Sequence, residues 1–551
     1  MTQLNLMTEG SPRRRILRFA LPILGGYFFQ QLYNTVDALI VGNFLDADAL
    51  AAVTSTSSYM YLLIGFVTGF STGAGIIIAR HIGAGNAENT RKAVHTAVAL
   101  GLVLSALLTA VGILITPPIL RLMGTPQGVI GRSSAYLRVY FAGSFALVMY
   151  NMLVSILQAS GESRFPLLCL VASSLVNIAL DVVFVALFHM DVEGAALATV
   201  LSEVLSLILV AWRLLRTRES IRLEPRRIAF DLHNLKFILR YGFPTAMQGC
   251  VIDLSNMLIQ SYINSFGRDA MAGIGASLKI EGFMFLPVTA FSMALTTFVS
   301  QNVGARRMDR VREGTAFGLR CTAALLLGLG VLARFCAPWM IAFFNADPEI
   351  IRYGAGRTTV CALFSCLLGF SHTASAVMRG LGKPMTPMLV MLVCWCAVRV
   401  ALLFTVGQFF HDIRLVYWVY PFTWTLSTLV YLIDFKRMRL FSRTENANLD
   451  TRQGRDLTGT LIADIVLQLL SYVAQTEREF IHRRQAEGIA AAKARGIRFG
   501  ARPKPKPAIF SDCVRAWQSG QISSRAAAES CGVSHTTFIR WARRGEGEQE
   551  Q

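Results

Sequence analysis

The sequence predicts an all-α membrane protein, with twelve transmembrane helices in two pseudo-symmetric six-helix lobes and a helical tail. Three observations support this prediction: an apolar composition, apolar runs that recur along the chain, and positive charge confined to alternate connections. Hydrophobic residues make up 53% of the 551 residues, charged residues only 16%, and the mean hydropathy is +0.48. Soluble domains average about 25% charged residues, so this composition is typical of a chain that lies largely in a bilayer.

Apolar runs of about 20 residues are long enough to cross a hydrocarbon core of about 30 Å as helices. They alternate with short polar connections through the first four-fifths of the chain, after which the composition becomes polar. The predicted spans are residues 15–41, 52–77, 93–116, 134–157, 165–189, 193–213, 236–264, 275–300, 314–344, 355–378, 386–410 and 415–434.

Most of the net charge of +19 lies in every second connection. Arginines at 13–15 precede the first span, and the connection around 213–240 is the most basic one. The intervening connections, such as "HMDVEG", carry little positive charge. Because cytoplasmic loops are enriched in Lys and Arg, both termini are expected in the cytoplasm of a multi-pass protein of a bacterial inner or plasma membrane.

The two halves of the membrane region repeat one another at an offset of 221 residues. This offset places "HIGAGNAENTRKAV" on "NVGARRMDRVREGT", which matches Gly83 with Gly304. With one extra residue, Pro22 falls on Pro244. Because each half holds an even number of predicted spans, the halves form a parallel repeat, and the cleft between them is the expected binding place.

These observations divide the membrane region into a lobe at 1–221 and a lobe at 222–443. The stretch "GAGNAENTRK" lacks the Gly-Lys-Ser/Thr of a phosphate-binding loop, and no such loop occurs elsewhere. Transport energy is therefore expected from an H⁺ or Na⁺ gradient. The sequence predicts a protein that is not an enzyme, with no catalytic residue and no cofactor besides the coupling ion.

Polar side chains within the apolar spans of the first half are the candidates for the ion site. Asp37 lies in "QQLYNTVDALIVG" and Asp181 in "LVNIALDVVFV", with Asn177 one helical turn before it. Thr199 of the next span adds a hydroxyl. Such oxygen ligands suit a shared proton or a small cation such as Na⁺, and no other metal is expected. The alternative is that these groups only form hydrogen bonds between helices, but intramembrane carboxylates usually have a function.

The second half lacks this set. The same alignment places Leu402 opposite Asp181. Its own charged residues are Asp253 and Arg399, which could pair across the fold, extend to the lipid edge or serve a structural role. The ion site is therefore expected in the first half alone.

Several motifs resemble multidrug and toxic compound extrusion (MATE) transporters: "LYNTVDALIVGNF", "QASGESRFPLLCLVASSLVNIALDVVFV", "VEGAALATVLSEV" and "RGLGKPMTP". The resemblance runs through residues 10–435. It implies two six-helix lobes and the export of amphipathic, often cationic compounds against sodium or proton entry. It also implies an ion site in the first lobe at Asp37, Asn177, Asp181 and Thr199. Pro22 resembles the family proline associated with bending of the first helix.

The predicted function is therefore cation-coupled export of drugs, chiefly lipophilic cations, by a monomeric transporter that alternates access across the bilayer. One alternative is a lipid-linked oligosaccharide flippase of the wider superfamily, which the carboxylate set argues against. A second is a membrane-tethered DNA-binding protein whose spans serve only as an anchor. Twelve spans with buried carboxylates exceed what an anchor needs.

The tail differs from the rest of the chain. Residues 444–507 predict a long helix and a basic, proline-containing linker, and residues 508–551 predict a helix-turn-helix module. With "LDTRQGRD" and the helix "VAQTEREFIHRRQAEGIAAAKARG", residues 448–545 resemble the C-terminal part of serine recombinases of the resolvase/invertase type. The upstream catalytic domain of that family is replaced here by the membrane region, so no recombinase activity is expected. The candidates for DNA contact are His535, Thr536, Thr537 and Arg540. The alternative is a fusion remnant that is neutral to transport.

Overall fold

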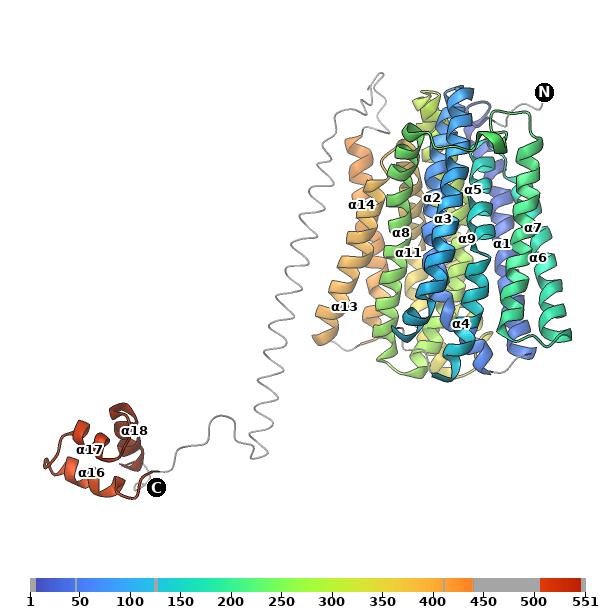
Figure 1. The fold of residues 1–551 in the computed structure, drawn as a ribbon. Helices are drawn as coiled ribbons and strands as arrows, with labels where there is room; N and C mark the ends of the chain where they lie inside the picture. Colours follow the sequence, from blue (N-terminus) through green and yellow to red (C-terminus); the bar gives the residue numbers. More distant parts are fainter. Residues whose placement is uncertain are drawn as a thin grey trace. The chain divides into compact units, whose positions relative to one another are not determined.

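The structure is a computed structural model that describes residues 6–44, 47–122, 127–409, 412–438, 440 and 506–546. At some helical positions, Asp37 among them, it describes the backbone alone. The described residues contain helices and connections but no strand (Figure 1). The chain divides into two compact units, Met1–Ala474 and Gln475–Gln551, and each is described by itself.

The first half of the membrane unit, the N-half, consists of long helices that follow the predicted apolar runs. Helices α4 and α5 are bent by 47° at the single residue that separates them, and α6 continues directly into the π-helix η1. The elements are α1 (Pro12–Phe44), α2 (Ala47–Gly83), α3 (Ala87–Leu122), α4 (Gln127–Ala142), α5 (Ser144–Ala159), α6 (Arg164–Asp181), η1 (Val182–Leu187) and α7 (Val192–Arg216).

The second half, the C-half, follows a short 3₁₀ turn, η2 (Pro225–Arg227). Its penultimate long helical segment, like that of the N-half, contains a π-helical stretch, η3, which here lies between two α-helices. The elements are α8 (Leu232–Asn264), α9 (Arg268–Gly304), α10 (Met308–Ala342), α11 (Pro348–Leu381), α12 (Met385–Val390), η3 (Met391–Ala397), α13 (Val398–Phe409) and α14 (Arg414–Arg437).

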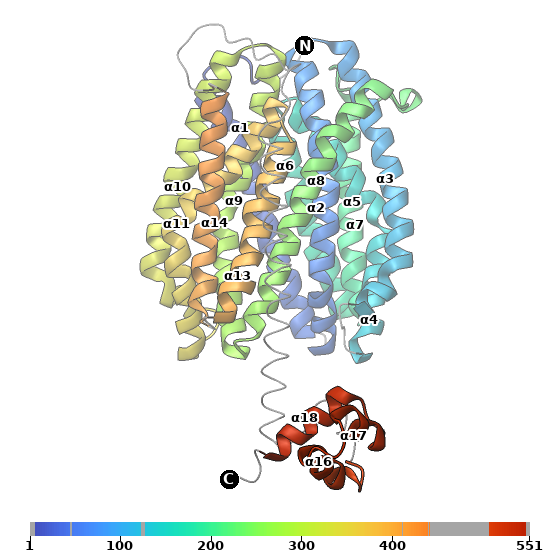
Figure 2. The same cartoon turned by 90° about the vertical axis from the view of Figure 1, so that its left-hand side faces the viewer.

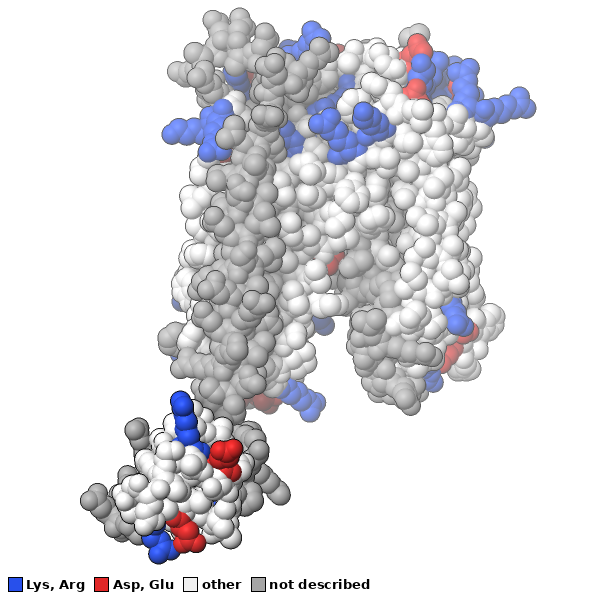
Figure 3. Space-filling view, turned by 60° about the vertical axis from the view of Figure 1, so that its left-hand side comes forward, with Lys and Arg blue, Asp and Glu red and all other residues white. Residues whose placement is uncertain are grey.

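Eight helical segments of the described chain are long and apolar enough to cross a membrane, and the bent pair α4–α5 would make nine. Large apolar side chains lie exposed on their outer surfaces, for example Leu114, Trp339 and Phe343. In water such exposure would be costly, whereas lipid tails solvate these groups. Figure 3 shows the Lys and Arg side chains gathered mainly at one end of the helices, here called the basic end. The N-terminus and the basic segment 213–227, which leads from α7 to α8, lie at this end (Figure 1).

Helix α1 packs against the C-half near its start and against the other helices of its own half, the N-half, near its end. Near its start, Phe19 shares an apolar core with Phe298 of α9. Near its end, Ile40 packs with Val185 of η1, in the N-half. Pro22 lies inside the helix, close to where it leaves the C-half. Because proline removes one helical hydrogen bond, this is a natural place for α1 to bend.

Helix α8 of the C-half also contacts both halves, but its first part packs against the N-half and its second part against the C-half. Before Pro244, its backbone at Gly242 lies so close to Gly73 of α2 that a Cβ on Gly73 would overlap it. Beyond Pro244, the Ser255 hydroxyl donates to the carbonyl of Trp395 in η3 over 2.6 Å. Figure 2 shows α2 and α8 side by side between α10, α11 and α14 on one side and α3, α5 and α7 on the other. The sequence match of Pro22 with Pro244 therefore corresponds to two equivalent crossing helices.

The halves meet most tightly at the basic end, where α2 crosses α9. A Cβ on Gly83 would overlap the carbonyl of Gln301, and a Cβ on Gly304 would overlap the carbonyl of Arg80. At the offset of 221, Arg80 corresponds to Gln301 and Gly83 to Gly304. The contact is therefore pseudo-symmetric, and each glycine allows the other helix to approach closely.

The N-terminal segment 6–10, here called the strap, lies across this contact. The Met7 amide donates to Gln301 Oε1 over 2.8 Å, and Gln301 Nε2 donates to the carbonyl of Ala159 of α5 over 2.7 Å. Arg310 of α10 donates to the strap carbonyls of Gly10 and Met7 over 2.7 and 3.0 Å. One buried glutamine thus ties the strap, the C-half and the N-half together at the basic end.

The second unit contains three described helices, α16 (Phe510–Gln518), α17 (Ser524–Ser530) and α18 (His535–Glu546). Phe510, Ala527 and Phe538 lie in their common core. The turn between α17 and α18 contains Gly532 with φ +62°, a conformation that glycine adopts without strain. The predicted long helix and linker fall on residues outside the described part of the chain.

Candidate functional site

Two of the four predicted ion ligands lie together on α6. Asn177 is 1% exposed and Asp181 is 0% exposed, and the two are one turn apart on the same helix face. Neither the amide oxygen nor the amide nitrogen of Asn177 has a hydrogen-bond partner among the described residues. A buried amide without partners costs free energy, so this position is suited to a ligand that completes its bonding. Asp181 is also where the α-helix changes into the π-helix η1, a distortion that is frequent at functional sites.

The elements that carry the other two predicted ligands meet at the same level. Asp37 is a position described by its backbone alone, but its neighbours Val36 and Ile40 pack in one cluster with Val185 of η1 and Ala195 of α7. Thus α1 reaches the turn of helix that follows Asp181.

Thr199 lies one turn beyond Ala195 on α7. Its hydroxyl donates to the carbonyl of Ala195 over 3.1 Å. The donor is therefore used within the helix, and the oxygen lone pairs remain free to accept a proton or to bind a cation. The predicted set thus comes from three elements that are packed against one another.

Glu203 is a further carboxylate on α7 that the sequence interpretation missed. It lies one turn after Thr199 in "LATVLSEVLSL" and is partly buried. It forms no ion pair with any residue that the structure describes. The signal was present, because a charge within an apolar span is the same signal that selected Asp181.

The C-half holds a different buried charge cluster. Arg357 of α11 is 0% exposed and forms an ion pair of 2.6 Å with Glu281 of α9. It also donates to the Ser277 hydroxyl over 2.9 Å. The sequence interpretation missed this pair because its members are 76 residues apart, and no local spacing connects them.

The predicted pair of Asp253 and Arg399 does not form in this structure. Arg399 is buried, donates to the Thr423 hydroxyl over 2.9 Å and lies 4.6 Å above the ring of Tyr420. Asp253 lies on α8 where it faces α2, with a carboxylate oxygen 3.7 Å from the place of a Cβ on Gly65. Asp253 lies on α8 and Arg399 on α13, and Arg399 obtains its stabilisation from a hydroxyl and aromatic rings instead.

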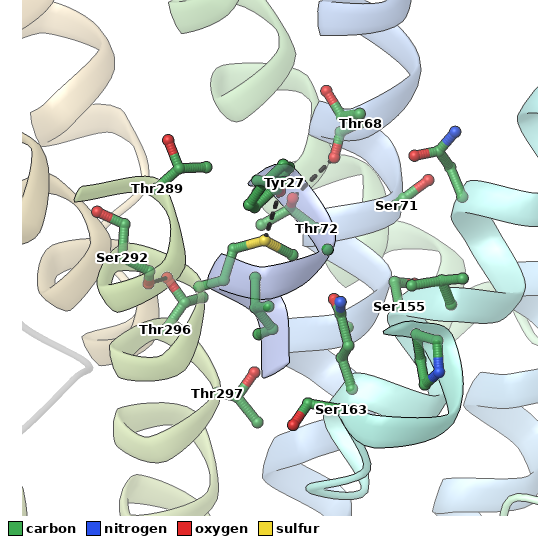
Figure 4. Close-up of a pocket in the computed structure, with 18 of the residues that line it drawn as sticks. Tyr27, Thr68, Ser71, Thr72, Ser155, Ser163, Thr289, Ser292, Thr296 and Thr297 are labelled. Atoms are coloured by element: carbon green, nitrogen blue, oxygen red, sulfur yellow. Dashed lines mark hydrogen bonds between the residues drawn. The ribbon is translucent and has the colours of Figure 1, made fainter. Parts of the chain in front are cut away.

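A cavity of about 410 Å³ lies between the halves, within the usual range of small-molecule pockets. Figure 4 shows hydroxyl groups of α2, α5 and α9 arranged around Tyr27 of α1. The polar and ionisable residues that line it are Tyr27, Gln30, Thr68, Ser71, Thr72, Tyr150, Asn151, Ser155, Gln158, Ser163, Thr289, Ser292, Thr296, Thr297, His372 and Arg379.

The hydroxyls of this cavity follow the internal repeat. At the offset of 221, Thr68 of α2 corresponds to Thr289 of α9, and Ser71 corresponds to Ser292. Most of them donate to their own helix, as Thr68 does to the carbonyl of Ile64 over 2.9 Å. They therefore present oxygen lone pairs to the cavity. The repeat could have revealed this lining from sequence, because two hydroxyls recur at corresponding positions on two helices.

The cavity is closed at the basic end by the α2–α9 contact and the strap. Figure 3 shows the surface hollowed at the opposite end, between the two halves. Access to the cavity in this state is therefore from the end that lacks the basic segment 213–227. Pro22 lines the cavity as well, so a bend in α1 at this residue would change the shape of the cavity wall.

A model of the MatE family matches residues 22–183 and 244–405, which together are more than half of the chain. The chain belongs to the MatE family. Its relatives include the "probable multidrug resistance protein YoeA" of Bacillus subtilis, with 28% identity over 426 residues that cover 76% of this chain and 92% of that protein. The "probable multidrug resistance protein NorM" of Thermotoga maritima is 25% identical and covers 72% of this chain and 86% of its own.

A solved structure of similar fold is a MOP superfamily transporter from Pyrococcus furiosus. It has a TM-score of 0.75 and 23% identity and covers 80% of this chain and 98% of that chain. MatE proteins are transporters, so this protein is a multi-pass membrane transporter and not an enzyme, and its relatives support a role in drug export. The family match ends before the tail. The resemblance of the tail to serine recombinases thus gains no support from it.

The four residues predicted to contact DNA lie on α18 or at its start. His535, Thr536 and Arg540 are exposed and Thr537 is half-buried. His535 Nε2 lies 3.1 Å from the Ser524 hydroxyl.

The hydroxyls of Thr536 and Thr537 lie 3.2 and 2.8 Å from that of Ser534. Arg540 is thus the only one of the four whose side chain makes none of these contacts within the module.

Proposed function

We propose that the protein is an H⁺- or Na⁺-coupled antiporter that exports amphipathic drugs and toxic compounds by alternating access. The observation that carries the proposal is the pairing of two separate sites within one transporter fold. One is a central cavity between the halves that is closed at one end, and the other is a buried oxygen cluster within the N-half. Cargo and coupling ion thus have different binding places on elements that pack together.

The coupling ion is assigned to Asp37, Asn177, Asp181 and Thr199, with Glu203 as a further carboxylate nearby. Burial of Asn177 and Asp181 and the unpartnered amide of Asn177 support this assignment. Carboxylate, amide and hydroxyl oxygens suit Na⁺, and closely placed carboxylates also suit a shared proton.

Twelve membrane crossings with both termini in the cytoplasm complete the proposed topology. Each of the twelve predicted apolar ranges overlaps a helix or a directly joined pair of helices. The basic end would then face the cytoplasm. With that orientation, the cavity is closed toward the cytoplasm and the structure represents an outward-facing state of a monomeric transporter.

Exchange between inward- and outward-facing states requires the halves to move against each other. Helices α1 and α8 are the elements that cross between the halves, and each contains a proline, Pro22 or Pro244, near its crossing point. We assign these prolines as paired bending points. Ion binding favours one state and cargo binding the other, since an ion with equal affinity for both states could drive nothing.

The tail is proposed to be a fusion remnant without recombinase activity and without a role in transport. Its three helices and the Gly532 turn are compatible with a helix-turn-helix module that contacts DNA through α18. The exposed Arg540 is the residue best placed for such a contact. A flippase for lipid-linked oligosaccharides remains the alternative for the whole chain, whereas membership of a transporter family argues against a membrane-tethered DNA-binding protein whose spans are only an anchor.

Dye efflux by the full chain in membrane vesicles, driven by an imposed H⁺ or Na⁺ gradient, tests the proposal. Asp181→Asn and Asp37→Asn should each abolish efflux without loss of folded protein. Glu193→Gln, which alters an exposed carboxyl at the start of α7, is the matched control and should transport normally. Normal efflux by either aspartate variant would remove that residue from the ion site. The gradient that drives efflux identifies the ion.

A further inference from the structure

We propose that the central cavity receives amphiphiles through an anionic group, and that Arg379 binds this group. This assignment rests on the proposed export function and changes the expected cargo, because the sequence predicted lipophilic cations.

Arg379 of α11 carries the only permanent charge among the described residues that line the cavity. No carboxylate of the described chain forms an ion pair with it. Its Nη1 donates to Gln248 Oε1 over 3.0 Å and to the Ser375 hydroxyl over 2.8 Å, whereas its Nε is buried without a partner. A guanidinium is always protonated, so the cavity contains a fixed positive charge whose donors are only partly used.

A second arginine lies beside the backbone that follows Arg379. Arg80 of α2 donates to the carbonyl of Gly380, the residue that follows Arg379, over 2.9 Å, and to the hydroxyl of Tyr241 over 2.8 Å. It too forms no ion pair with a described residue. Arg80 thus contacts the backbone next to Arg379 near the closed end of the cavity, although it does not line the cavity itself. A cationic cargo would be repelled there, and an anionic cargo would supply the missing counter-charge.

The rest of the cavity suits the other parts of an amphiphile. Phe285, Met293 and Leu170 provide apolar and aromatic surface. Ser292 is 8% exposed, lines the cavity and has no hydrogen-bond partner for its hydroxyl among the described residues. His372 lies between the rings of Phe285 and Trp395, with centroids at 4.6 and 5.0 Å. A ligand with a carboxylate, sulfonate or phosphate on an aromatic body would satisfy Arg379 and cover this apolar surface.

This cargo has a consequence for the driving force. When a cation enters as a cationic drug leaves one for one, the charges cancel. When a cation enters as an anion leaves, both movements carry positive charge in the same direction. A membrane potential that is negative on the cargo side should therefore accelerate export of an anion and leave the one-for-one exchange of cations little affected.

The test uses two xanthene dyes of opposite charge, anionic fluorescein and cationic rhodamine 6G. Their binding to the purified full-length protein is measured by fluorescence anisotropy, so it does not depend on transport. Fluorescein should bind more tightly than rhodamine 6G. Arg379→Gln should weaken fluorescein binding by at least about tenfold, and should not weaken rhodamine 6G binding. Arg379→Lys, which keeps the charge but not the planar fork, should bind fluorescein with intermediate affinity.

Lys383→Gln is the matched control, because it removes one positive charge from an exposed position four residues away and should leave both affinities unchanged. Tighter binding of rhodamine 6G by the wild-type protein would overturn the assignment. Fluorescein affinity that is unchanged in a folded Arg379→Gln variant would also overturn it. If that variant does not fold, the wild-type preference between the two dyes and the Arg379→Lys variant decide.

Transport in proteoliposomes separates this inference from the proposed export function. Fluorescein uptake that rises with a potential negative on the cargo side supports both. Failure to move either dye under any ion gradient would contradict the export function, whereas the binding data would still decide the polarity of the cavity. Transport of rhodamine 6G without fluorescein would support export and contradict the role of Arg379.

Discussion

The two halves of the membrane unit share a backbone plan and differ in their buried charged groups. Pro22 and Pro244, and likewise Gly83 and Gly304, occupy equivalent places. The N-half buries carboxylate and amide oxygens on α6, whereas the C-half places arginines among its buried charged groups. The repeat therefore preserves helix crossings, and the polar side chains within each half have diverged.

The comparison suggests why the proposed ion site lies in only one half. In the C-half, the carboxylate of Glu281 already has a cation, the guanidinium of Arg357 at 2.6 Å. In the N-half, the amide of Asn177 has no partner among the described residues, so a mobile cation would complete its bonding. The C-half contains its own counter-ion for Glu281, and we propose that the N-half binds a cation from solution.

The largest effect on stability is expected when the internal ion pair of the C-half is broken. Arg357→Ala leaves Glu281 in a largely apolar setting without its partner and should lower the free energy of unfolding by about 3–5 kcal/mol. Thermal unfolding in detergent measures this loss. The double variant Arg357→Ala with Glu281→Ala should be more stable than the single one, because no charge is left unpaired. A single variant as stable as the double one would show that the pair does not compensate the buried charge.

A smaller effect is expected when the N-half charge is copied into the C-half. Leu402→Asp places a carboxylate at the position that corresponds to Asp181 in the repeat. Its charge should lower the free energy of unfolding by about 2.5–3.5 kcal/mol. Leu402→Asn, which is polar but neutral, is the control for the charge. We expect no new ion coupling, because Arg399 and the aromatic rings fill this part of the C-half. Recovery of dye efflux by Leu402→Asp in the Asp181→Asn background would contradict this and show that the halves are interchangeable.

Substitutions on either side of the contact between α2 and α9 should lower the stability of the protein by similar amounts. Gly83→Ala and Gly304→Ala each introduce a methyl group against a backbone carbonyl of the other helix, at an expected cost of about 1–3 kcal/mol. Similar shifts in unfolding temperature would support the pseudo-symmetry. Gly328→Ala on α10 is the control, since a Cβ there meets nothing within 4 Å and should be neutral or stabilising. A large shift for only one of the pair would show that the contact is asymmetric.

The smallest effect concerns how the first helix of each half begins. The carboxylate of Asp231, the residue before α8, accepts a hydrogen bond from the backbone N–H of Asn234 over 2.8 Å. This bond lowers the pKa of the Asp231 carboxyl below its ordinary value. Asp231→Ala should cost about 1 kcal/mol. Because the folded pKa is lowered, the stabilisation is complete above the unfolded pKa of about 3.9 and is lost as the pH falls through the folded pKa. Unfolding measured between pH 7 and pH 3 should show the difference shrink at the acidic end.

The α1 counterpart is held by the strap instead, through Arg310. Since a guanidinium does not titrate in this range, Arg310→Ala should destabilise the protein by an amount that hardly changes with pH. A pH dependence of equal size for both variants would argue against this difference between the halves.

Much of the fold was predictable because its signals are local. Apolar runs, alternating basic connections and the offset of 221 identified the helices and the equivalent glycines and prolines. The i, i+4 spacing placed Asn177 and Asp181 on one face before the structure was known. Glu203 could have been predicted by the same rule, and the recurrence of Thr68 and Ser71 as Thr289 and Ser292 could have identified the cavity lining.

Other parts of the site could not be predicted, because they depend on residues far apart in the sequence. Asp253 and Arg399, for which pairing was one of the possibilities, form no ion pair with each other, whereas Glu281 pairs with Arg357. Nothing in "SAVMRGLGKP" indicates that Arg379 lines a cavity, since the same letters fit a basic helix end in a cytoplasmic loop. The expected preference for cationic cargo came from the family resemblance and not from the residues.

By itself, then, the sequence determined the membrane class, the repeat and the oxygen-rich face of α6. These follow from hydropathy and helical periodicity, which act between neighbouring residues. Only the tertiary structure decided which charges are paired, where the cavity closes and which sign of charge lines it. Those properties depend on how helices from the two halves pack, and a change of a few ångströms decides whether an arginine meets a carboxylate or remains available to a ligand.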